Sequence, residues 1–208
     1  MPRGSEELTR ARREEIVSAC AVLYETMSFG EVTIAAIAAE TTFTRTSIYN
    51  YFRTKEEIFL ALLQREHEAW TADLESARAG AVPGGGFAAA LAGTLVPRGC
   101  MLRLMSMNIY DMEMNSRIEN LAEFKRSYAA ARGAVAGCLL AFRPDVGGRG
   151  ADEFLRVFFP FLFGVYPYTS HTEKQLRAME LAGIEPPRET VFELTRGFAD
   201  SFLSSLEI

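Results

Sequence analysis

The sequence predicts an all-α fold, and two observations support this. Apolar residues recur three or four positions apart through most of the 208 residues, which is the spacing of one face of an amphipathic helix. No segment shows the alternation of apolar and polar residues that is typical of a half-buried β-strand. Clusters of glycine and proline at 80–86, 144–150 and 186–187 separate the helical segments from one another.

The first segments predict one long helix, two short ones and a second long one. Residues 8–28 place their apolar side chains on one face. Two short helices follow at 34–40 and 44–51, each with a threonine at its start that is suited to cap the backbone N–H groups. Thr54 and Glu57 have the spacing of a capping box, which opens a helix that continues to the glycine-rich break at residue 80.

The remaining helices are expected at 87–95, 101–113, 116–142, 151–168, 172–182 and 188–206. The longest apolar run, 154–168, contains Arg156 and two prolines and is too short for a membrane span, so we expect no membrane segment. The charged first residues lack a secretory signal, and the three cysteines are odd in number and far apart. A cytoplasmic location with free thiols is therefore expected. No motif indicates a metal or a cofactor.

One short stretch differs in charge from the rest of the chain. The protein carries 22 Lys and Arg against 27 Asp and Glu, a net charge of −5. Residues 41–55, TTFTRTSIYNYFRTK, nevertheless hold three cations, eight side-chain hydroxyls and no acidic group. Hydroxyls, cations and backbone N–H groups at a helix N-terminus are the groups that bind phosphate oxygens. The stretch therefore indicates a surface for nucleic acid.

Two short helices joined by a tight turn are the arrangement of a DNA-binding helix-turn-helix. Ile37, Phe43, Ile48 and Phe52 are expected to be buried between these helices and their neighbours. Arginine and asparagine have the hydrogen-bonding geometry to read guanine and adenine edges. The side chains expected to point outward are Arg45, Thr46, Ser47, Tyr49 and Asn50.

The run TIAAIAAETTFTRTSIYNYFRTKEEIF resembles the DNA-binding domain of the tetracycline-repressor (TetR) family of bacterial transcriptional regulators. The resemblance implies a three-helix helix-turn-helix domain over 1–53, followed by a larger helical effector-binding and dimerisation domain over 54–208. Thr42 stands where the family usually has a small residue, so we expect a left-handed backbone there. By the same resemblance, phosphate contacts fall to Thr33, Thr44, Tyr49, Tyr51 and Lys55, and base-facing positions to Arg45, Thr46 and Asn50.

The DNA-binding region is not basic overall, since the first 65 residues carry eight Lys and Arg against nine Asp and Glu. Few phosphate contacts per subunit indicate a homodimer on palindromic double-stranded DNA. The last helix has an apolar stripe, and the segment 151–166 is apolar nearly all round. An intramolecular core is the alternative role for both. The predicted interface residues are Phe154, Phe158, Val191, Thr195, Phe198 and Phe202.

The middle of the chain is rich in methionine and aromatic residues, which suits an apolar ligand site with a few polar groups. The family resemblance also implies an inducer-binding C-terminal half. The alternative is a methionine-rich core without a ligand. The candidate ligand-binding residues are Trp70, Met101, Met105, Asn108, Met112, Phe124, Tyr128, Phe159, Phe163 and Tyr166.

Taken together, the sequence predicts a repressor that a hydrophobic or aromatic small molecule releases from its operator. An activator of the same fold is the first alternative. A helical enzyme is disfavoured because H-E-x-x-H, G-x-S-x-G and P-loop motifs are absent from the sequence. A redox sensor would have to use Cys100 or Cys138, which have no characteristic spacing.

Overall fold

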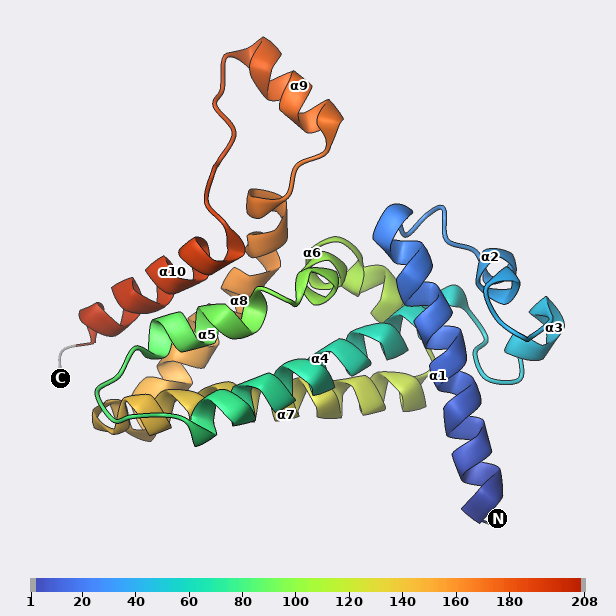
Figure 1. The fold of residues 1–208 in the computed structure, drawn as a ribbon, viewed down its shortest axis with the longest axis horizontal. Coiled ribbons are helices and arrows are strands. Elements are labelled where there is room, and N and C mark those ends of the chain that lie inside the picture. Colours follow the sequence, from blue (N-terminus) through green and yellow to red (C-terminus); the bar gives the residue numbers. More distant parts are fainter. Residues whose placement is uncertain (1–2, 207–208) are drawn as a thin grey trace. The chain divides into compact units, whose positions relative to one another are not determined.

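The computed structural model describes the backbone of residues 3–206 and the side chains of residues 6–206. Figure 1 shows that this part of the chain is helical throughout, which confirms the predicted fold class. The helices are α1 (Arg3–Thr26), α2 (Ile34–Ala39), α3 (Arg45–Ile48), α4 (Lys55–Ala79), α5 (Phe87–Leu95), α6 (Gly99–Met114), α7 (Ile118–Phe142), the short 3₁₀ turn η1 (Pro144–Val146), α8 (Gly147–Thr169), α9 (Glu173–Ala182) and α10 (Val191–Ser205).

The chain forms two compact units. The first unit comprises residues up to Glu66 together with Asn108–Ser127, and the second comprises His67–Met107 together with the residues from Tyr128 onward. The boundaries fall inside α4, α6 and α7, because each of these helices contributes to both units. The first unit is thus larger than the segment 1–53 that was expected to bind DNA. The functional division at residue 53 stays a prediction.

The first unit packs α1 against the short helices through apolar side chains. Ile16 and Cys20 of α1 are fully buried, as are Ile37 of α2, Ile48 of α3 and Phe52 beyond it. Three of the four residues predicted to be buried between the short helices are therefore buried. Phe43 is half-buried, with its ring edge-on to that of Tyr51. This packing fixes which side of α3 faces outward.

The second unit has an aromatic core. The indole N–H of Trp70 donates to the hydroxyl of Thr94 at 2.9 Å, and that hydroxyl donates to the carbonyl of Leu91. Both groups are buried, so the hydrogen bonds remove the cost of burying them unpaired. A second group of rings joins α8 to α10: Phe154 and Phe158 are stacked 5.0 Å apart, and Phe198 lies 6.0 Å from Phe158.

No single helix among residues 3–206 is long and apolar enough to cross a membrane, although α5 and α6 would pass together, by length and composition, as a pair bent by 75°.

The buried His67 provides a test of the second unit by pH. Its ring lies 5.7 Å from that of Tyr128, and burial lowers the pKa of His67 from 6.5 to about 4. The unfolded chain takes up this proton at a higher pH than the folded chain does. Stability therefore falls as the pH falls from 6.5 towards 4, and we expect a loss of about 2 kcal/mol from this group between about pH 7.5 and pH 5.

His67→Phe should remove that part of the pH dependence, which urea unfolding followed by circular dichroism at both pH values will measure. His171→Gln is the matched control, because His171 lies outside the core in the segment before α9. The control should retain the full dependence. An equal loss of stability in wild type and His67→Phe would contradict the prediction.

Candidate DNA-binding site

Two threonines cap the short helices, as predicted. The hydroxyl of Thr33 accepts from the N–H of Ala36 at 3.1 Å at the start of α2. The hydroxyl of Thr44 accepts from the N–H of Ser47 at 3.2 Å at the start of α3 and also hydrogen-bonds to the Ser47 hydroxyl. Each cap satisfies a backbone donor that a helix start leaves open. Both threonines have exposed side chains, so they lie at the surface where the helices begin.

The turn between α2 and α3 is held by an acidic residue of α1. One carboxylate oxygen of Glu15 accepts from the backbone N–H of Thr42 at 2.9 Å and from its hydroxyl at 2.8 Å. These hydrogen bonds hold the pKa of Glu15 below its usual value. The left-handed backbone expected for Thr42 was wrong, because no non-glycine residue in the described chain has a positive φ. The Glu15 side chain of α1 thus holds this turn by hydrogen bonds, where a glycine would form the turn through its conformational freedom.

The third helix is shorter than predicted, but the chain continues in the same direction. The helix α3 ends at Ile48 rather than Tyr51. The N–H of Tyr51 still donates to the carbonyl of Ile48 at 2.9 Å, and that of Phe52 to the same carbonyl at 3.0 Å. The turn that follows α3 therefore keeps Tyr49 and Asn50 beside the residues of the helix.

The outward face of this segment carries the predicted DNA-reading groups. Arg45, Thr46, Tyr49 and Asn50 are exposed, and Ser47 and Tyr51 are half-buried. In the part of the chain that the structure describes, neither the Arg45 nor the Arg53 guanidinium has a hydrogen-bonding or ion-pair partner. Both cations are therefore available to an anion. Beside them, an open groove of about 500 Å³ between α1 and the turn is lined by residues that include Arg12, Thr44 and Ser47.

Lys55 has partners within the chain. Its ammonium donates to the carbonyls of Phe29 at 2.7 Å and Val32 at 3.3 Å, and it lies 4.7 Å from the centre of the Phe29 ring. The sequence argument that a cation in the first turn of α4 needs a phosphate opposite was therefore incomplete, because these carbonyls already stabilise it. A phosphate contact by Lys55 stays a prediction.

The basic residues of α1 are also engaged. Arg13 donates to the carbonyl of Tyr51 at 3.1 Å and stacks 4.3 Å from the centre of the Phe52 ring. Its burial lowers the pKa of Arg13 from the ordinary value. Arg12 lies over the ring of Phe43 at 5.4 Å. These two arginines hold the helix-turn-helix against α1, while Arg10 stays exposed.

A buried carboxylate anchors the C-terminal end of the motif. Glu57 is 1% exposed and accepts from the backbone N–H of Arg53 at 2.8 Å. It also accepts from the backbone N–H of Arg117 and from two guanidinium nitrogens of that residue, at 2.6 and 2.9 Å. Burial would raise the pKa of Glu57, but the hydrogen bonds from Arg117 and Arg53 outweigh it and hold the pKa below its usual value.

The predicted capping box at Thr54 is confirmed in one half. The Thr54 hydroxyl accepts from the N–H of Glu57 at 3.1 Å. The Glu57 carboxylate, however, binds Arg53 and Arg117 instead of returning to Thr54. The Thr54 hydroxyl also donates to the carbonyl of Asn115. The start of α4 is thereby tied to the turn between α6 and α7.

Comparison with known proteins decides the family. A family model described as "Bacterial regulatory proteins, tetR family" matches residues 16–62, and one described as "Tetracyclin repressor-like, C-terminal domain" matches residues 64–203. The chain belongs to the TetR family. It is therefore a DNA-binding transcriptional regulator, and the helix-turn-helix described above is its DNA-binding motif.

One solved structure supports the fold. The fatty acid degradation regulator FadR from Bacillus halodurans has a TM-score of 0.61 at 12% identity, covering 94% of this chain and 96% of that one. AmtR from Mycobacterium smegmatis has a TM-score of 0.43 at 21% identity, covering 84% of this chain and 96% of that one. No curated protein matches the sequence.

The candidate ligand residues of this TetR-family regulator fall into two groups. Asn108, Met112 and Phe124 belong to the first unit, where the Asn108 side chain accepts from the Tyr24 hydroxyl at 3.1 Å. The others belong to the second unit. Trp70, Met101, Met105 and Phe159 are buried there, Tyr128 and Tyr166 are half-buried, and Phe163 is exposed.

The candidate dimer residues are largely used within one chain. Phe154, Phe158 and Thr195 are fully buried, because α10 packs on both α5 and α8. Val191, Phe198 and Phe202 are half-buried. The alternative role considered for these stripes, an intramolecular core, therefore holds for the three buried residues. The large exposed apolar side chains of α8 are instead Val157, Phe163 and Tyr168.

The three cysteines differ in burial. Cys20 and Cys138 are buried and Cys100 is half-buried, and all three are free thiols. Burial raises the pKa of Cys138 to about 11, so this thiol has little thiolate with which to sense an oxidant. Among the described residues, no group of three or more His, Cys, Asp and Glu side chains could hold a metal ion.

Sequence reasoning missed Glu15 and Arg117, two of the residues that hold the motif. Glu15 lies on the exposed side of an amphipathic helix, and Arg117 lies 60 positions from Glu57. Nothing in the local sequence distinguishes them from ordinary surface charges. The capping-box spacing did draw attention to Glu57. It predicted that the carboxylate binds the backbone N–H of Thr54, whereas the carboxylate binds Arg53 and Arg117.

Removing the Glu57 carboxylate should destabilise the protein. Glu57→Ala leaves two part-buried backbone N–H groups and the Arg117 guanidinium without their acceptor, and we expect a loss of about 3 kcal/mol in the free energy of unfolding at neutral pH. The low pKa means that this contribution is present above pH 4.5, the ordinary value, and is lost as the pH falls below it. Urea unfolding measures both effects.

The matched control is Glu56→Ala at the adjacent position of the same helical turn, which should change stability by less than about 0.5 kcal/mol. Equal effects of the two substitutions would show that the buried pair with Arg117 does not stabilise the fold.

Proposed function

We propose that this regulator is a repressor that binds a palindromic operator as a homodimer and is released by a hydrophobic or aromatic small molecule. The observation that carries the proposal is the outward face of α3 and its following turn. Arg45 and Asn50 lie there beside exposed hydroxyls, on a segment whose opposite side is fixed in the core through Ile48 and Phe52. Such a rigid segment can present base-reading side chains in the major groove.

Two subunits are needed because one motif offers few free cations. Arg12, Arg13 and Lys55 already contact groups of their own chain, which leaves Arg45, Arg53 and Arg10 as the principal cations for DNA. Each phosphate contact contributes roughly 0.9 to the salt dependence of binding, so one subunit would bind weakly at physiological salt. Two subunits on a two-fold axis double the contacts and read two half-sites.

The proposed effector site lies in the second unit, around Trp70, Met101, Met105 and Phe159. All four side chains are buried, the rings of Trp70 and Phe159 lie 6.1 Å apart, and Tyr128 places a phenol edge-on to Phe159 at 5.2 Å. The Arg132 guanidinium lies 4.9 Å from the centre of the Phe159 ring, which adds a cation beside the apolar group. This combination favours an apolar or aromatic molecule with one polar or anionic end.

The route from effector to DNA runs along continuous helices. The helix α4 begins at Lys55, beside the DNA-binding motif, and ends at Ala79 in the second unit. The helix α7 begins beside Arg117, which binds Glu57, and also continues into the second unit. An effector that favours one placement of these helices shifts the spacing of the two reading heads. It acts only through its different affinity for the two states.

Arg45→Ala should weaken operator binding and relax sequence preference at one position of each half-site. Loss of a bidentate contact to guanine costs about 1–3 kcal/mol, or roughly 5- to 160-fold in affinity. Selection of bound DNA from a random pool, followed by titration of the selected sequence, measures both effects. We expect wild type to enrich a palindrome.

Two further substitutions distinguish recognition of bases from electrostatic attraction to phosphates. Arg53→Ala removes a cation expected at a phosphate and should weaken binding to all sequences alike, lowering the salt slope by about 0.9. Arg149→Ala, whose exposed side chain lies on α8, should change neither. Absence of any enriched sequence with folded wild-type protein at low salt would overturn the proposed DNA reading.

The effector proposal uses Trp70 as its reporter, because it is the only tryptophan in the chain and is buried. We expect aromatic carboxylic acids or medium-chain fatty acids to change its fluorescence and to lower operator affinity over the same concentration range. Trp70→Phe should keep the effect on DNA and lose the signal. A fluorescence change without any change in operator affinity would contradict release by an effector.

A further inference from the structure

The helix α3 is too short to hold its own position. It has four residues, Arg45–Ile48, and only Ile48 among them is buried. A single helical turn has almost no stability of its own, because forming the first turn fixes several backbone angles for one hydrogen bond. The direction in which Arg45 and Thr46 point is therefore set by the packing of Ile48 and by the contacts at the two ends of α3.

One turn of α1 contacts the chain on both sides of α3. In Figure 1, α2 and α3 lie on one side of α1. Before α3, the Glu15 carboxylate accepts from the N–H and from the hydroxyl of Thr42 at 2.9 and 2.8 Å. After α3, Arg13 donates to the carbonyl of Tyr51 at 3.1 Å. Glu15 and Arg13 are two positions apart, so a single turn of α1 is the frame against which α3 is placed.

The turn between α2 and α3 depends on Glu15 because its other donors are satisfied locally. The three other backbone N–H groups of residues 40–43 donate to acceptors within residues 37–41, at 3.1 to 3.2 Å. Of these four N–H groups of the described chain, the N–H of Thr42 has its partner in another helix. Loss of the Glu15 carboxylate therefore leaves the turn without its hydrogen bonds to α1.

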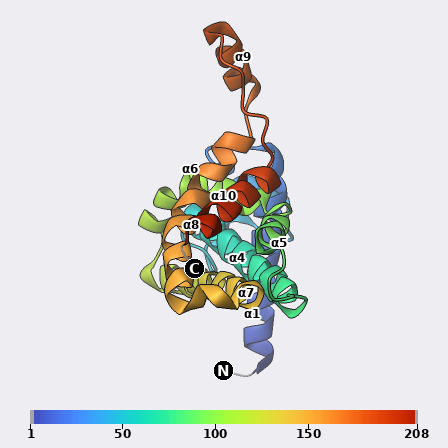
Figure 2. The ribbon, with the colours of Figure 1, turned by 90° about the vertical axis from the view of Figure 1, so that its left-hand side faces the viewer.

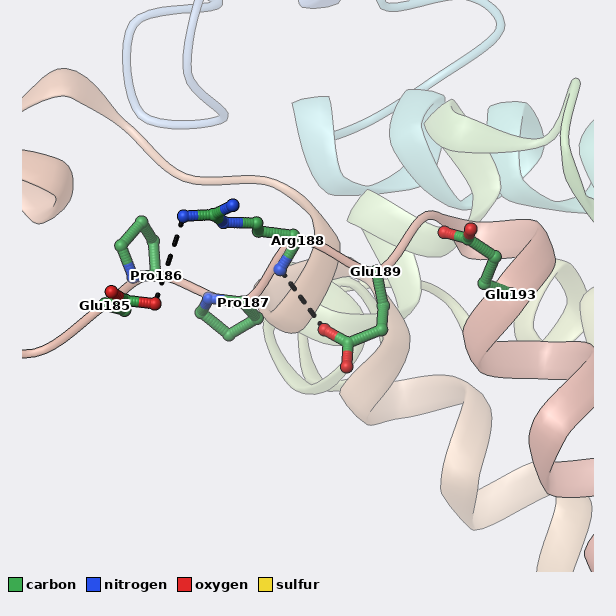
Figure 3. A pocket seen from close by; sticks show the side chains of 6 residues that line it. All are labelled: Glu185, Pro186, Pro187, Arg188, Glu189 and Glu193. Atoms are coloured by element: carbon green, nitrogen blue, oxygen red, sulfur yellow. Dashed lines mark hydrogen bonds and ion pairs between the residues drawn. The ribbon is translucent and has the colours of Figure 1, made fainter.

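An acidic groove in the second unit shows the contrasting, local arrangement. It lies in the segment between α8 and α10, whose helix α9 stands away from both in Figure 2. Figure 3 shows Arg188 there between two acids: its guanidinium lies 3.9 Å from the Glu185 carboxylate, and its backbone N–H donates to Glu189 at 3.2 Å. These partners are one to three positions apart, so they order only their own segment. The contact of Glu15 spans 27 positions and joins two elements.

Glu15 also brings a negative charge to a place where phosphate is expected. The groove between α1 and the turn is lined by Glu15 together with Thr44 and Ser47. Hydrogen bonds from the backbone and the hydroxyl of Thr42 hold the pKa of Glu15 below its usual value, so the carboxylate is ionised at neutral pH. An anion beside phosphates disfavours every DNA sequence alike. The placement of α3, in contrast, favours only the sequence that α3 reads.

We propose that Glu15 is a positioning residue that raises the preference of this regulator for its operator over other DNA. Its hydrogen bonds to Thr42 fix the start of α3, and its charge opposes binding that does not use the base contacts of α3. The inference rests on the proposed reading of bases by α3 and adds the residue that aligns this helix. Glu15 acts through Thr42 rather than by touching a base.

The test compares two affinities of the full-length chain. One is for the operator selected from a random pool, and the other is for a duplex of the same length and composition in scrambled order. Glu15→Ala removes the charge and the acceptor, whereas Glu15→Gln removes the charge and keeps an oxygen that accepts from Thr42. Both variants should bind scrambled DNA about two- to fivefold more tightly at low salt. Only Glu15→Ala should lose preference for the operator, by at least about fivefold, the effect of one mismatched base pair.

The ratio of the two affinities separates positioning from stability. A partly unfolded variant binds both duplexes less in the same proportion, so its ratio stays that of the wild type. Glu14→Ala and Glu14→Gln are the matched controls, because Glu14 is adjacent in α1 but binds Arg65 at 2.6 Å instead of the turn. Both control variants should keep the wild-type ratio.

Thr42→Val tests the other side of the contact. It removes the hydroxyl donor and keeps the backbone N–H, so the ratio should fall by less than in Glu15→Ala. In a chain that already carries Glu15→Ala, Thr42→Val should have no further effect, because the two residues act through one contact. A loss that adds fully to that of Glu15→Ala would contradict this coupling.

Each remaining outcome decides one part of the proposal. An unchanged ratio in Glu15→Ala would overturn the positioning role. An equal loss in Glu15→Gln would also overturn it, because the charge rather than the hydrogen bonds would then set the preference. Unchanged affinity for scrambled DNA in both variants would overturn the role of the charge. A folded wild-type chain that enriches no sequence would instead overturn the proposed reading of DNA itself.

Discussion

The DNA-binding motif depends on one buried carboxylate. Glu57 accepts the backbone N–H of Arg53 at the end of the helix-turn-helix and the backbone and guanidinium of Arg117 at the start of α7. Arg117 in turn reaches the carbonyl of Tyr51, which Arg13 of α1 also binds. Three segments far apart in sequence, at residues 13, 51–57 and 117, therefore meet around one charge. Its removal from water is costly, and only the full set of donors offsets that cost. The Glu57 carboxylate lies where α4 and α7 both start, so a movement of either helix changes the hydrogen bonds that it accepts.

The acidic chain binds DNA through the placement of its charges rather than their number. Glu15 faces the turn and accepts from Thr42, while Arg12 and Arg13 lie on aromatic rings. A count of charges alone would assign the two arginines to DNA binding, but in the structure they stabilise the motif. Arg45 and Arg53 have no such partners in the described chain, and they stand on the outward side. The hydroxyls have a similar division: Thr33 and Thr44 cap helices, while Thr46 and Tyr49 face outward.

In the second unit the apolar surface exceeds what one chain covers. The stripe of α10 is largely satisfied by α5 and α8, and Thr195 is buried within it. Large exposed apolar residues lie on α8 and in the segment 170–190 that follows it, and also at Val82, Val96 and Met107. An apolar stripe on a helix has the same spacing whether it packs in its own core or against a partner. The burial of these residues in the structure distinguishes the two roles, which the sequence alone does not. The aromatic core around Trp70 and Phe159 lies in the same unit, which places the proposed effector site and the proposed interface on shared helices.

The sequence by itself determined the helices and the motif. Periodicity, capping threonines and glycine or proline breaks gave almost every helix within a few residues, because these signals are local and act through the backbone. It also placed residues 41–55 in a helix-turn-helix of the TetR family, since the family pattern is contiguous. Tertiary structure decided which side chains are free. Lys55, Arg12 and Arg13 contact groups of their own chain. Thr42 has an ordinary backbone conformation and is held by Glu15. Phe154 and Phe158 are buried in the core. Each of these outcomes depends on a contact with a residue tens of positions away. Local spacing in the sequence carries no information about which distant residue makes that contact.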